Sequence, residues 1–237
     1  MYNLQGLVRK NIINANAQFE RLGYVSTNVS NYLTNGYKPV RFETMLNEDG
    51  YLTGTVRTDF SQAGLRLTQK KYDVGIDGVG FIPVTSETGE VTYTRDGSFK
   101  VNTDGYLVTN DGHVVGAGIK IPANHFKIII KSNGIVQSIA KNGDEPVDVG
   151  EIPLVNFQNP EGLKSANMNK YIATQESGEP ILIKKHESFK QGFLETSGTD
   201  IYASVNDVLR LNASMITSTK LMKVVDDMYY KAINLTE

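Results

Sequence analysis

Residues 91–115 read VTYTRDGSFKVNTDGYLVTNDGHVV, and this stretch decides the fold class. Three Asp-Gly pairs, at 96–97, 104–105 and 111–112, separate short runs that are rich in β-branched and aromatic residues. Because Asp-Gly favours the positive φ angles of tight hairpin turns, each pair predicts a reversal between two antiparallel strands. The stretch therefore predicts short, consecutive β-strands.

Two more Asp-Gly pairs, at 49–50 and 77–78, and two Asn-Gly pairs, at 133–134 and 142–143, extend the pattern. No crossover helix is predicted between the strands, which argues against a parallel α/β sheet. We predict a mainly β core domain over residues 71–195, with a Greek-key, sandwich-like or partial-barrel architecture. Its expected strands are 81–85, 91–94, 98–101, 106–109, 114–115, 126–130, 135–139, 152–157, 171–174 and 181–184.

The N-terminal segment, residues 1–38, has a helical pattern instead. Its first 34 residues contain no proline, and apolar residues recur in steps of three and four, which places them on one helix face. The pattern stops at Asn35-Gly36, a helix stop signal. The stripe comprises Leu4, Val8, Ile12, Ala15, Phe19, Leu22, Val25, Val29 and Leu33.

The C-terminal segment, residues 196–237, mirrors this pattern, with a helix start predicted at Thr199-Asp200. Its main stripe has the spacing of a coiled-coil seam and comprises Val208, Leu211, Met215, Ser218, Met222, Val225, Tyr229 and Ala232. A second, partial stripe widens the apolar face and comprises Val205, Leu209, Ile216, Val224, Met228 and Leu235. Residues 39–70 are expected to form an extended linker.

Neither terminal stripe can be buried by a β core that has its own alternating pattern. The helices must pack on each other or on other subunits, since a single helix with an unburied apolar face is marginal in water. We predict a coiled-coil-type assembly segment whose ends are partly disordered in the monomer and fold on assembly.

Composition excludes several functions. The chain has 24 Lys and Arg against 26 Asp and Glu, a net charge of −2, without the basic footprint of a sequence-independent nucleic-acid binder. It has no cysteine, which excludes disulfides, thiolate zinc sites and iron–sulfur clusters. Dinucleotide, P-loop, EF-hand and G-x-S-x-G patterns all fail. We therefore expect no catalytic residue, no cofactor and no metal site.

Several motifs occur in order along nearly the whole chain. Asn28, Asn31, Thr34, Gly36, Tyr37 and Lys38 form the first, and it closes the N-terminal helix. The more specific second block spans 73–81, 93–101 and 105–109, and later blocks lie at 149–152, 159–163 and 191–197. Together these motifs resemble the bacterial flagellar rod and hook family. One departure is the stretch 212–216, where the family has an Arg-Ala-aromatic-Glu run.

The resemblance implies a structural subunit of the flagellar basal-body rod, the drive shaft that transmits torque. It implies paired terminal helices in an inner tubular layer with a β domain outside. The implied partners are copies of this chain, other rod proteins and the flagellar export apparatus, with no nucleic acid and no small-molecule substrate. The implied location is the periplasm-spanning rod, reached without a cleaved signal peptide. Because 39–70 looks short for the distal-rod type, we favour the proximal rod, with the distal rod as the alternative.

The assembly interface that we predict combines the stripes with two motif residues. It comprises Leu4, Val8, Phe19, Leu22, Val29, Asn31, Gly36, Leu211, Met215, Met222, Val225 and Tyr229. Two other functions stay open. A secreted carbohydrate-binding β domain would place aromatic residues such as Tyr93 and Tyr106 at a groove. A regulatory adaptor would bind one partner through its C-terminal helix.

Overall fold

A computed structural model describes residues 4–46, 48, 52–167 and 169–234. The chain forms two compact units. Unit 1 combines Met1–Tyr32, Pro39–Thr58 and Thr199–Glu237, and unit 2 combines Leu33–Lys38 and Asp59–Gly198. The two ends of the chain therefore fold together, and the chain passes into unit 2 twice.

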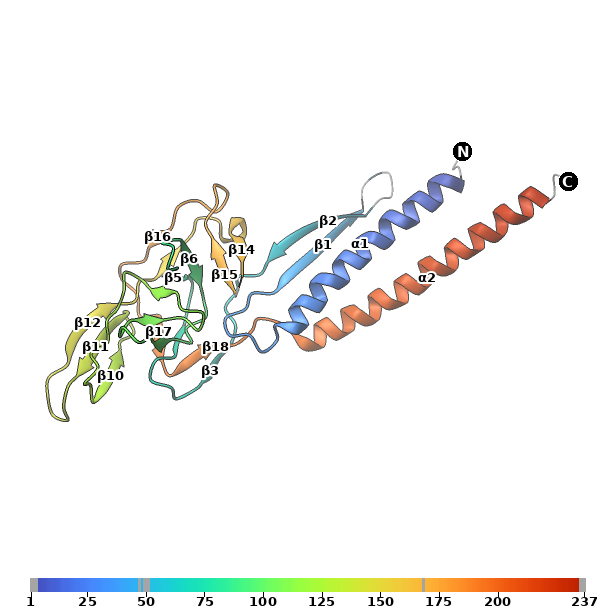
Figure 1. The fold of residues 1–237 in the computed structure, drawn as a ribbon. Helices are drawn as coiled ribbons and strands as arrows, with labels where there is room; N and C mark the ends of the chain where they lie inside the picture. Colours follow the sequence, from blue (N-terminus) through green and yellow to red (C-terminus); the bar gives the residue numbers. More distant parts are fainter. Residues whose placement is uncertain (1–3, 47, 49–51, 168, 235–237) are drawn as a thin grey trace. The chain divides into compact units, whose positions relative to one another are not determined.

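Unit 1 is built on two long helices, α1 (Leu4–Ser30) and α2 (Ile201–Asn234). They run antiparallel, with both termini at one end of the pair (Figure 1). The predicted start of the second helix is confirmed, because Asp200 Oδ1 accepts the backbone N–H groups of Tyr202 and Ala203 at 2.9 and 3.0 Å. This cap satisfies donors that the first helical turn leaves free.

The helix α1 ends at Ser30, five residues before the expected stop at Asn35. At this end of α1, three polar side chains each hydrogen-bond the carbonyl four residues back. Thr27 bonds to Gly23 O, Ser30 to Ser26 O, and Asn31 to Thr27 O.

The expected linker over 39–70 contains regular structure. Strands β1 (Val40–Leu46) and β2 (Leu52–Thr58) form an antiparallel hairpin in unit 1, with Phe42 opposite Val56. The ring of Phe42 stacks on Tyr24 of α1 at 5.6 Å. The Asn28 side chain also makes two hydrogen bonds with the backbone of Val40, of 2.7 and 2.9 Å. The hairpin is thus fixed to α1 by contacts that local sequence does not reveal.

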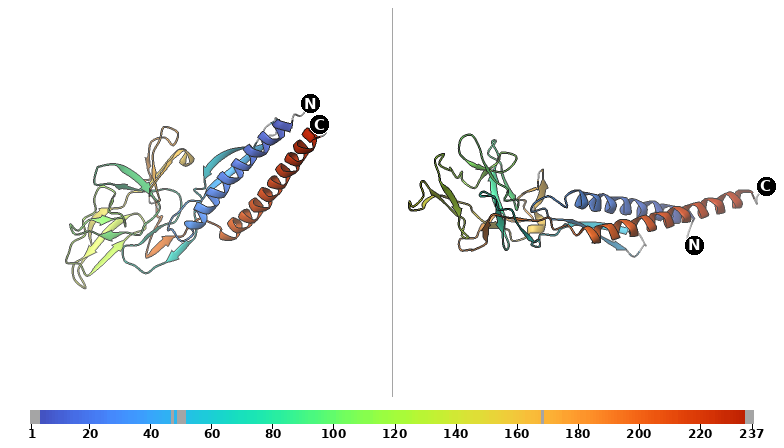
Figure 2. Two further views of the ribbon diagram at one scale, coloured as in Figure 1. Left: turned by 45° about the vertical axis from the view of Figure 1, so that its right-hand side comes forward. Right: turned by 90° about the horizontal axis from the view of Figure 1, so that it is seen from below.

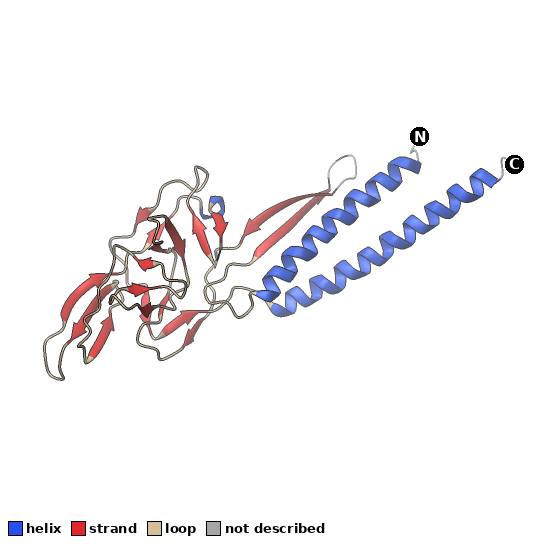
Figure 3. Ribbon diagram, in the orientation of Figure 1, coloured by secondary structure: helices blue, strands red, loops and turns tan. Residues whose placement is uncertain are grey.

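Unit 2 is mainly β, as predicted (Figure 3). Its largest sheet has seven antiparallel strands in the order β14-β15-β6-β5-β9-β8-β7. The strands are β5 (Ile82–Thr85), β6 (Val91–Thr94), β7 (Lys100–Val101), β8 (Leu107–Val108), β9 (Val114–Val115), β14 (Lys164–Ala166) and β15 (Lys170–Ile172).

Smaller antiparallel ladders complete unit 2, with the orders β10-β11-β12, β17-β4, β18-β3 and β13-β16. The first three strands are β10 (Lys127–Ile130), β11 (Ile135–Ile139) and β12 (Val147–Glu151). The paired strands are β3 (Leu65–Leu67), β4 (Val74–Ile76), β13 (Val155–Asn156), β16 (Ile181–Leu182), β17 (Phe189–Gln191) and β18 (Phe193–Glu195), and a 3₁₀ turn, η1, spans Pro160–Gly162.

The predicted turns are partly confirmed. Gly105 and Gly112 follow their aspartates with φ angles of +87° and +93°, which glycine adopts without a steric penalty. Gly97 is different, because its φ is not positive and its place is fixed by packing. A β-carbon there would lie inside the van der Waals radius of the Val74 carbonyl oxygen. The pair 49–50 lies outside the described residues.

Two buried clusters form the core of unit 2. The smaller cluster is aromatic, with Phe81, Tyr93, Phe157 and Tyr171 in edge-to-face contact. The larger cluster joins the seven-stranded sheet to the smaller ladders and contains Val74, Ile76, Ile82, Val84, Phe99, Leu107, Val115, Ile119, Ile121, Ile128, Ile130, Val136, Ile152, Leu154 and Phe189.

The core assignment predicts a position-specific loss of stability. Leu107 is fully buried, whereas Val91 is 45% exposed on the same sheet. We expect Leu107→Ala to lower the free energy of unfolding by about 2–5 kcal/mol, because it leaves a cavity. The control Val91→Ala should change it by about 0.5 kcal/mol. Urea unfolding measures both, and equal losses would show that Leu107 is not a core residue.

Candidate assembly interface

The two helices of unit 1 form a seam within one chain. Leu211 of α2 and Ala17 of α1 are buried, at 5% and 9% exposure. Arg21 pairs with Asp207 at 3.1 Å, and Thr199 Oγ1 donates to Asn28 O at 3.2 Å. Apolar burial and these polar contacts together fix the antiparallel register.

The structure places the predicted C-terminal stripe in this unit's interior rather than on an open face. Leu211 and Val225 are buried, and Met215, Met222 and Tyr229 are half-buried. Their spacing is that of a seam, and the neighbouring helix of the same chain supplies its other side.

The predicted N-terminal residues divide into several groups. Val8 and Leu22 are half-buried in unit 1, whereas Phe19 and Val29 are 57% and 36% exposed. Asn31 is half-buried and caps the end of α1. The side chain of Leu4 lies outside the described part of the structure.

An outer apolar surface remains on each helix. On α2 it comprises Val205, Leu209 and Ile216, which are 51%, 62% and 56% exposed, and we call these residues the α2 outer stripe. On α1, Ile12 and Phe19 are 45% and 57% exposed, seven residues apart. Residues at these spacings lie on one side of a helix. The α2 outer stripe belongs to the second, partial stripe that the sequence predicts, and the structure leaves these three residues exposed.

Gly36 belongs to unit 2, where it is buried beside the Arg95-Asp96 peptide. Its φ is +65°, and a β-carbon would lie 2.7 Å from Arg95 C and 2.9 Å from Asp96 N. Its own N–H donates to Glu195 O at 2.8 Å. Only glycine fits this position, because both the backbone angle and the close approach exclude a side chain.

Next to Gly36 lies a cluster of three buried charges. Glu195 accepts Lys38 Nζ on Oε1 at 2.7 Å and Arg95 Nε on Oε2 at 2.6 Å. All three side chains are 2% exposed or less. Burial, together with the positive charge of Arg95, lowers the pKa of Lys38, although Glu195 acts in the opposite direction.

Backbone groups satisfy the remaining hydrogen bonds of the cluster. Arg95 donates to Gly80 O at 2.7 Å and to Gly78 O at 2.9 Å. Lys38 donates to Ser61 O at 2.6 Å. A nearby contact, from Gly198 N to Tyr37 O at 2.9 Å, joins the two segments that lead toward the helices. The cluster therefore positions the chain where it leaves the β-rich unit.

The cluster predicts a large effect for one substitution. Glu195→Ala would leave two buried cations without their carboxylate, so we expect the free energy of unfolding to fall by about 3–5 kcal/mol. The control is Glu43→Gln, which removes an exposed partner of Arg57. It should change the free energy by less than about 1 kcal/mol in a urea titration. A loss for Glu195→Ala no larger than the control would show that the cluster is not essential.

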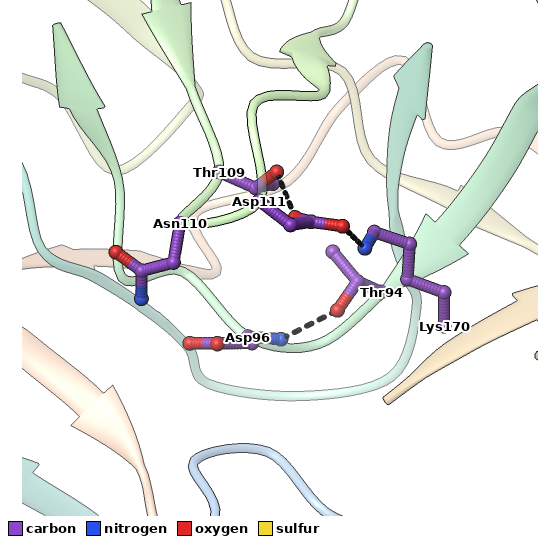
Figure 4. A pocket seen from close by; sticks show the side chains of 6 residues that line it. All are labelled: Thr94, Asp96, Thr109, Asn110, Asp111 and Lys170. Carbon is purple, nitrogen blue, oxygen red and sulfur yellow. Dashed lines mark hydrogen bonds and ion pairs between the residues drawn. The ribbon is translucent and has the colours of Figure 1, made fainter. Parts of the chain in front are cut away.

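A pocket of about 330 Å³ lies between the β8–β9 turn and β15 (Figure 4). Asp111 forms an ion pair with Lys170 and accepts Thr109 Oγ1 at 2.6 Å. Burial acts to raise the pKa of Asp111, but the hydrogen bonds from Lys170 and Thr109 hold it below its ordinary value. The contacts satisfy the lining groups internally, so they form a turn-stabilising network.

Asp96 lines the same pocket, but its pKa is shifted in the opposite direction from that of Asp111. Burial raises its pKa, and the negative charge of Asp73 adds to this, whereas hydrogen bonds from Ser98 oppose the shift. The folded form therefore holds its proton to a higher pH than the unfolded form does. Folding stability accordingly falls as pH rises from the ordinary carboxyl value through the raised one.

We expect Asp96→Asn to raise the folding stability by an amount that depends on pH. The amide oxygen can still accept the Ser98 N–H, but no charge is buried. The variant should unfold at a higher urea concentration than the unmodified chain at pH 7, and the difference should shrink toward about pH 4. The exposed control Asp104→Asn should show no such trend. A gain that is equal at both pH values would contradict the electrostatic cause.

The structure does not group the aromatic residues that a carbohydrate groove would need. Tyr93 is 7% exposed and packs against Phe157 at 4.8 Å, within the aromatic core. Tyr106 lies on another part of the sheet under Lys120. Among the described residues, no cluster of three or more His, Asp and Glu side chains could hold a metal ion. In the same part of the chain, neither long helix has an apolar run sufficient to cross a membrane.

Comparisons with known proteins define the class. A sequence model described as the flagellar hook protein FlgE/F/G D1 domain matches residues 75–138. The flagellar basal-body rod protein FlgG of Buchnera aphidicola subsp. Schizaphis graminum is 31% identical, over 92% of this chain and 95% of its own length. FlgG of Caulobacter vibrioides is 32% identical, over 76% and 70%. The flagellar hook protein FlgE of Brucella abortus is 36% identical, over 49% and 32%.

The chain has a β-rich unit and paired terminal helices, and its relatives are flagellar rod and hook proteins. These findings identify a structural subunit of the flagellar axis. The chain belongs to the flagellar rod and hook protein family. The length of segment 39–70 did not distinguish proximal-rod from distal-rod proteins, because the Buchnera FlgG aligns along nearly the whole of both chains. The expectation of a proximal position therefore finds no support, and the distal alternative is favoured.

Proposed function

We propose that this chain is a distal-rod subunit of the flagellar basal body and that it polymerises through its helix pair. The observation that carries the polymerisation is the α2 outer stripe, whose three apolar side chains are each more than half exposed. Burying them at about 25 cal/mol per Å² would favour association with another apolar surface.

The helix pair is suited to a filament rather than to a closed dimer. The seam uses one side of α2 within the chain and leaves the outer stripe for neighbours. A contact between two different surfaces of identical subunits produces a helical polymer when the rotation between subunits does not close a ring. Copies of this chain would then be the main partners, with other rod proteins at the two ends of the segment.

The distal placement is supported by relatives named FlgG that extend over nearly the full chain. Export by the flagellar apparatus and a location in the periplasm-spanning rod belong to the same proposal. In this reading the protein acts mechanically, since many repeated contacts give stiffness without any one strong interface.

The outer stripe predicts an assembly defect without a folding defect. Leu209→Asp combined with Ile216→Asp should abolish rod assembly and swimming, because two charges would enter an apolar contact. The control Ser214→Asp changes an exposed residue on another side of α2 and should leave both intact. Circular dichroism of the purified variants checks folding. Normal swimming of the double variant would refute the role of the stripe.

Placement along the rod needs a separate experiment. Deletion of the gene in the source organism, followed by electron cryotomography, should show a short rod that stops before the hook. A rod stalled at the inner membrane would instead indicate a proximal subunit.

A further inference from the structure

A polar pocket of about 540 Å³ in unit 2 contains an unusual carboxylate. Its lining includes Asp73, Ser98 and the basic residues Arg66, Lys70 and Lys100. Asp73 is 4% exposed, and its Oδ2 atom is buried with no hydrogen-bond partner among the described residues. A buried acceptor without a donor is costly, so a native structure generally supplies the donor from water or from a bound group.

The surroundings of this pocket are basic. A second pocket, of about 370 Å³, shares Leu67 and Lys70 with the first and adds Lys71, Lys127 and Phe126. We call Arg66, Lys70, Lys71, Lys100 and Lys127 the basic surface. Asp73 is the only acidic residue among the described residues that line the two pockets. The chain as a whole has a net charge of −2, so this concentration of cations is local.

Two exposed apolar side chains lie within the basic surface. Leu67 is 56% exposed and Phe126 is 61% exposed. A matching partner would therefore carry acidic groups beside an apolar side chain.

The same chain carries that combination at another place. Residues 144–148, which we call the acidic turn, read DEPVD and run from the connection after β11 into the first two residues of β12. Their side chains are exposed, and Val147 is 64% exposed between the acids. Lys141 and Asn142, just before them, offer donors. The acidic turn connects β11 to β12 at one end of the three-stranded sheet (Figures 1 and 2). Its base lies beside Phe126, whose backbone N–H donates to Ile139 O at 2.7 Å, and its charged side chains are exposed.

We propose that the acidic turn of one copy docks on the basic surface of the next copy. Glu145 and Asp144 face Lys70 and Arg66, and Val147 covers Leu67 and Phe126. This contact deepens the proposed function, on which it rests, by adding a link between the β-rich units of neighbouring copies.

Charge complementarity would make this contact specific for one register of the two subunits. Opposite charges at an interface set the register of the partners and exclude wrong pairings, and their effect is screened by salt. A charged contact at a site separate from the helix stripes would fix the axial spacing of the subunits.

Charge reversal in the full-length chain tests the proposal. Lys70→Glu and Glu145→Lys should each raise the critical concentration for polymerisation about tenfold at low salt. The chain that carries both changes should return to near the original value, because each contact then pairs opposite charges again. Glu87→Lys is the matched control, since Glu87 lies in another exposed acidic turn, and it should have no effect. Sedimentation measures all four.

Cysteine cross-linking gives an independent readout, because the chain has no cysteine of its own. Lys70→Cys and Glu145→Cys copies, mixed and mildly oxidised, should form a disulfide-linked heterodimer. A mixture of Lys70→Cys with Glu87→Cys should give at least about tenfold less, because docking raises the effective concentration only at the true contact.

The outcomes separate this inference from the proposed function. If neither reversal changes polymerisation while the α2 outer-stripe variant abolishes it, the docking proposal is wrong and the rod function stands. If only Lys70→Glu has an effect, the basic surface contacts another part of the neighbouring copy, and the proposed docking of the acidic turn is overturned. If the chain never polymerises but the mixed cysteine pair cross-links selectively, the docking holds and the proposed assembly through the helices fails.

Discussion

The β-rich unit depends on one buried carboxylate. Glu195 bonds to Lys38 and to Arg95, which lie 157 and 100 residues away in sequence, and the cluster is closed to solvent. Because a buried charge without its partner is far more costly than the pair, the three side chains must be buried together or not at all. This all-or-none requirement joins the segment 33–38 to the strand β18. It fixes where the chain leaves the β strands for the helices.

The helix α2 carries two kinds of apolar surface with two purposes. The seam residues, such as Leu211 and Val225, are buried within the chain and stabilise the fold of unit 1. Val205, Leu209 and Ile216 remain exposed and add nothing to the stability of the isolated chain. A subunit of a polymer needs both, because it must fold first and then bury further surface against its neighbours. The exposed stripe thus accounts for an apolar pattern wider than one helix pair requires.

Local charge matters more to this protein than its net charge. The near balance of acidic and basic residues argues against binding nucleic acid without regard to sequence. It cannot reveal that five cations surround two adjacent pockets or that three acids occupy one exposed turn. The separation of these groups arises from strand pairing, which brings Arg66, Lys100 and Lys127 onto one surface from different ladders. Charge summed over a chain carries no information about such placement.

The sequence by itself determined the features that depend on near neighbours. Helical periodicity gave both terminal helices, the Thr199-Asp200 cap marked where α2 begins, and Asp-Gly pairs located turns such as those at Gly105 and Gly112. Motif order also indicated the family. The tertiary structure decided the rest, because it depends on residues distant in sequence. The hairpin over 40–58 is held by Asn28 and Tyr24, and the choice between seam and outer stripe on α2 depends on which side α1 covers. Periodicity shows that a helix has an apolar face, but only the packed partner decides which part of that face is buried.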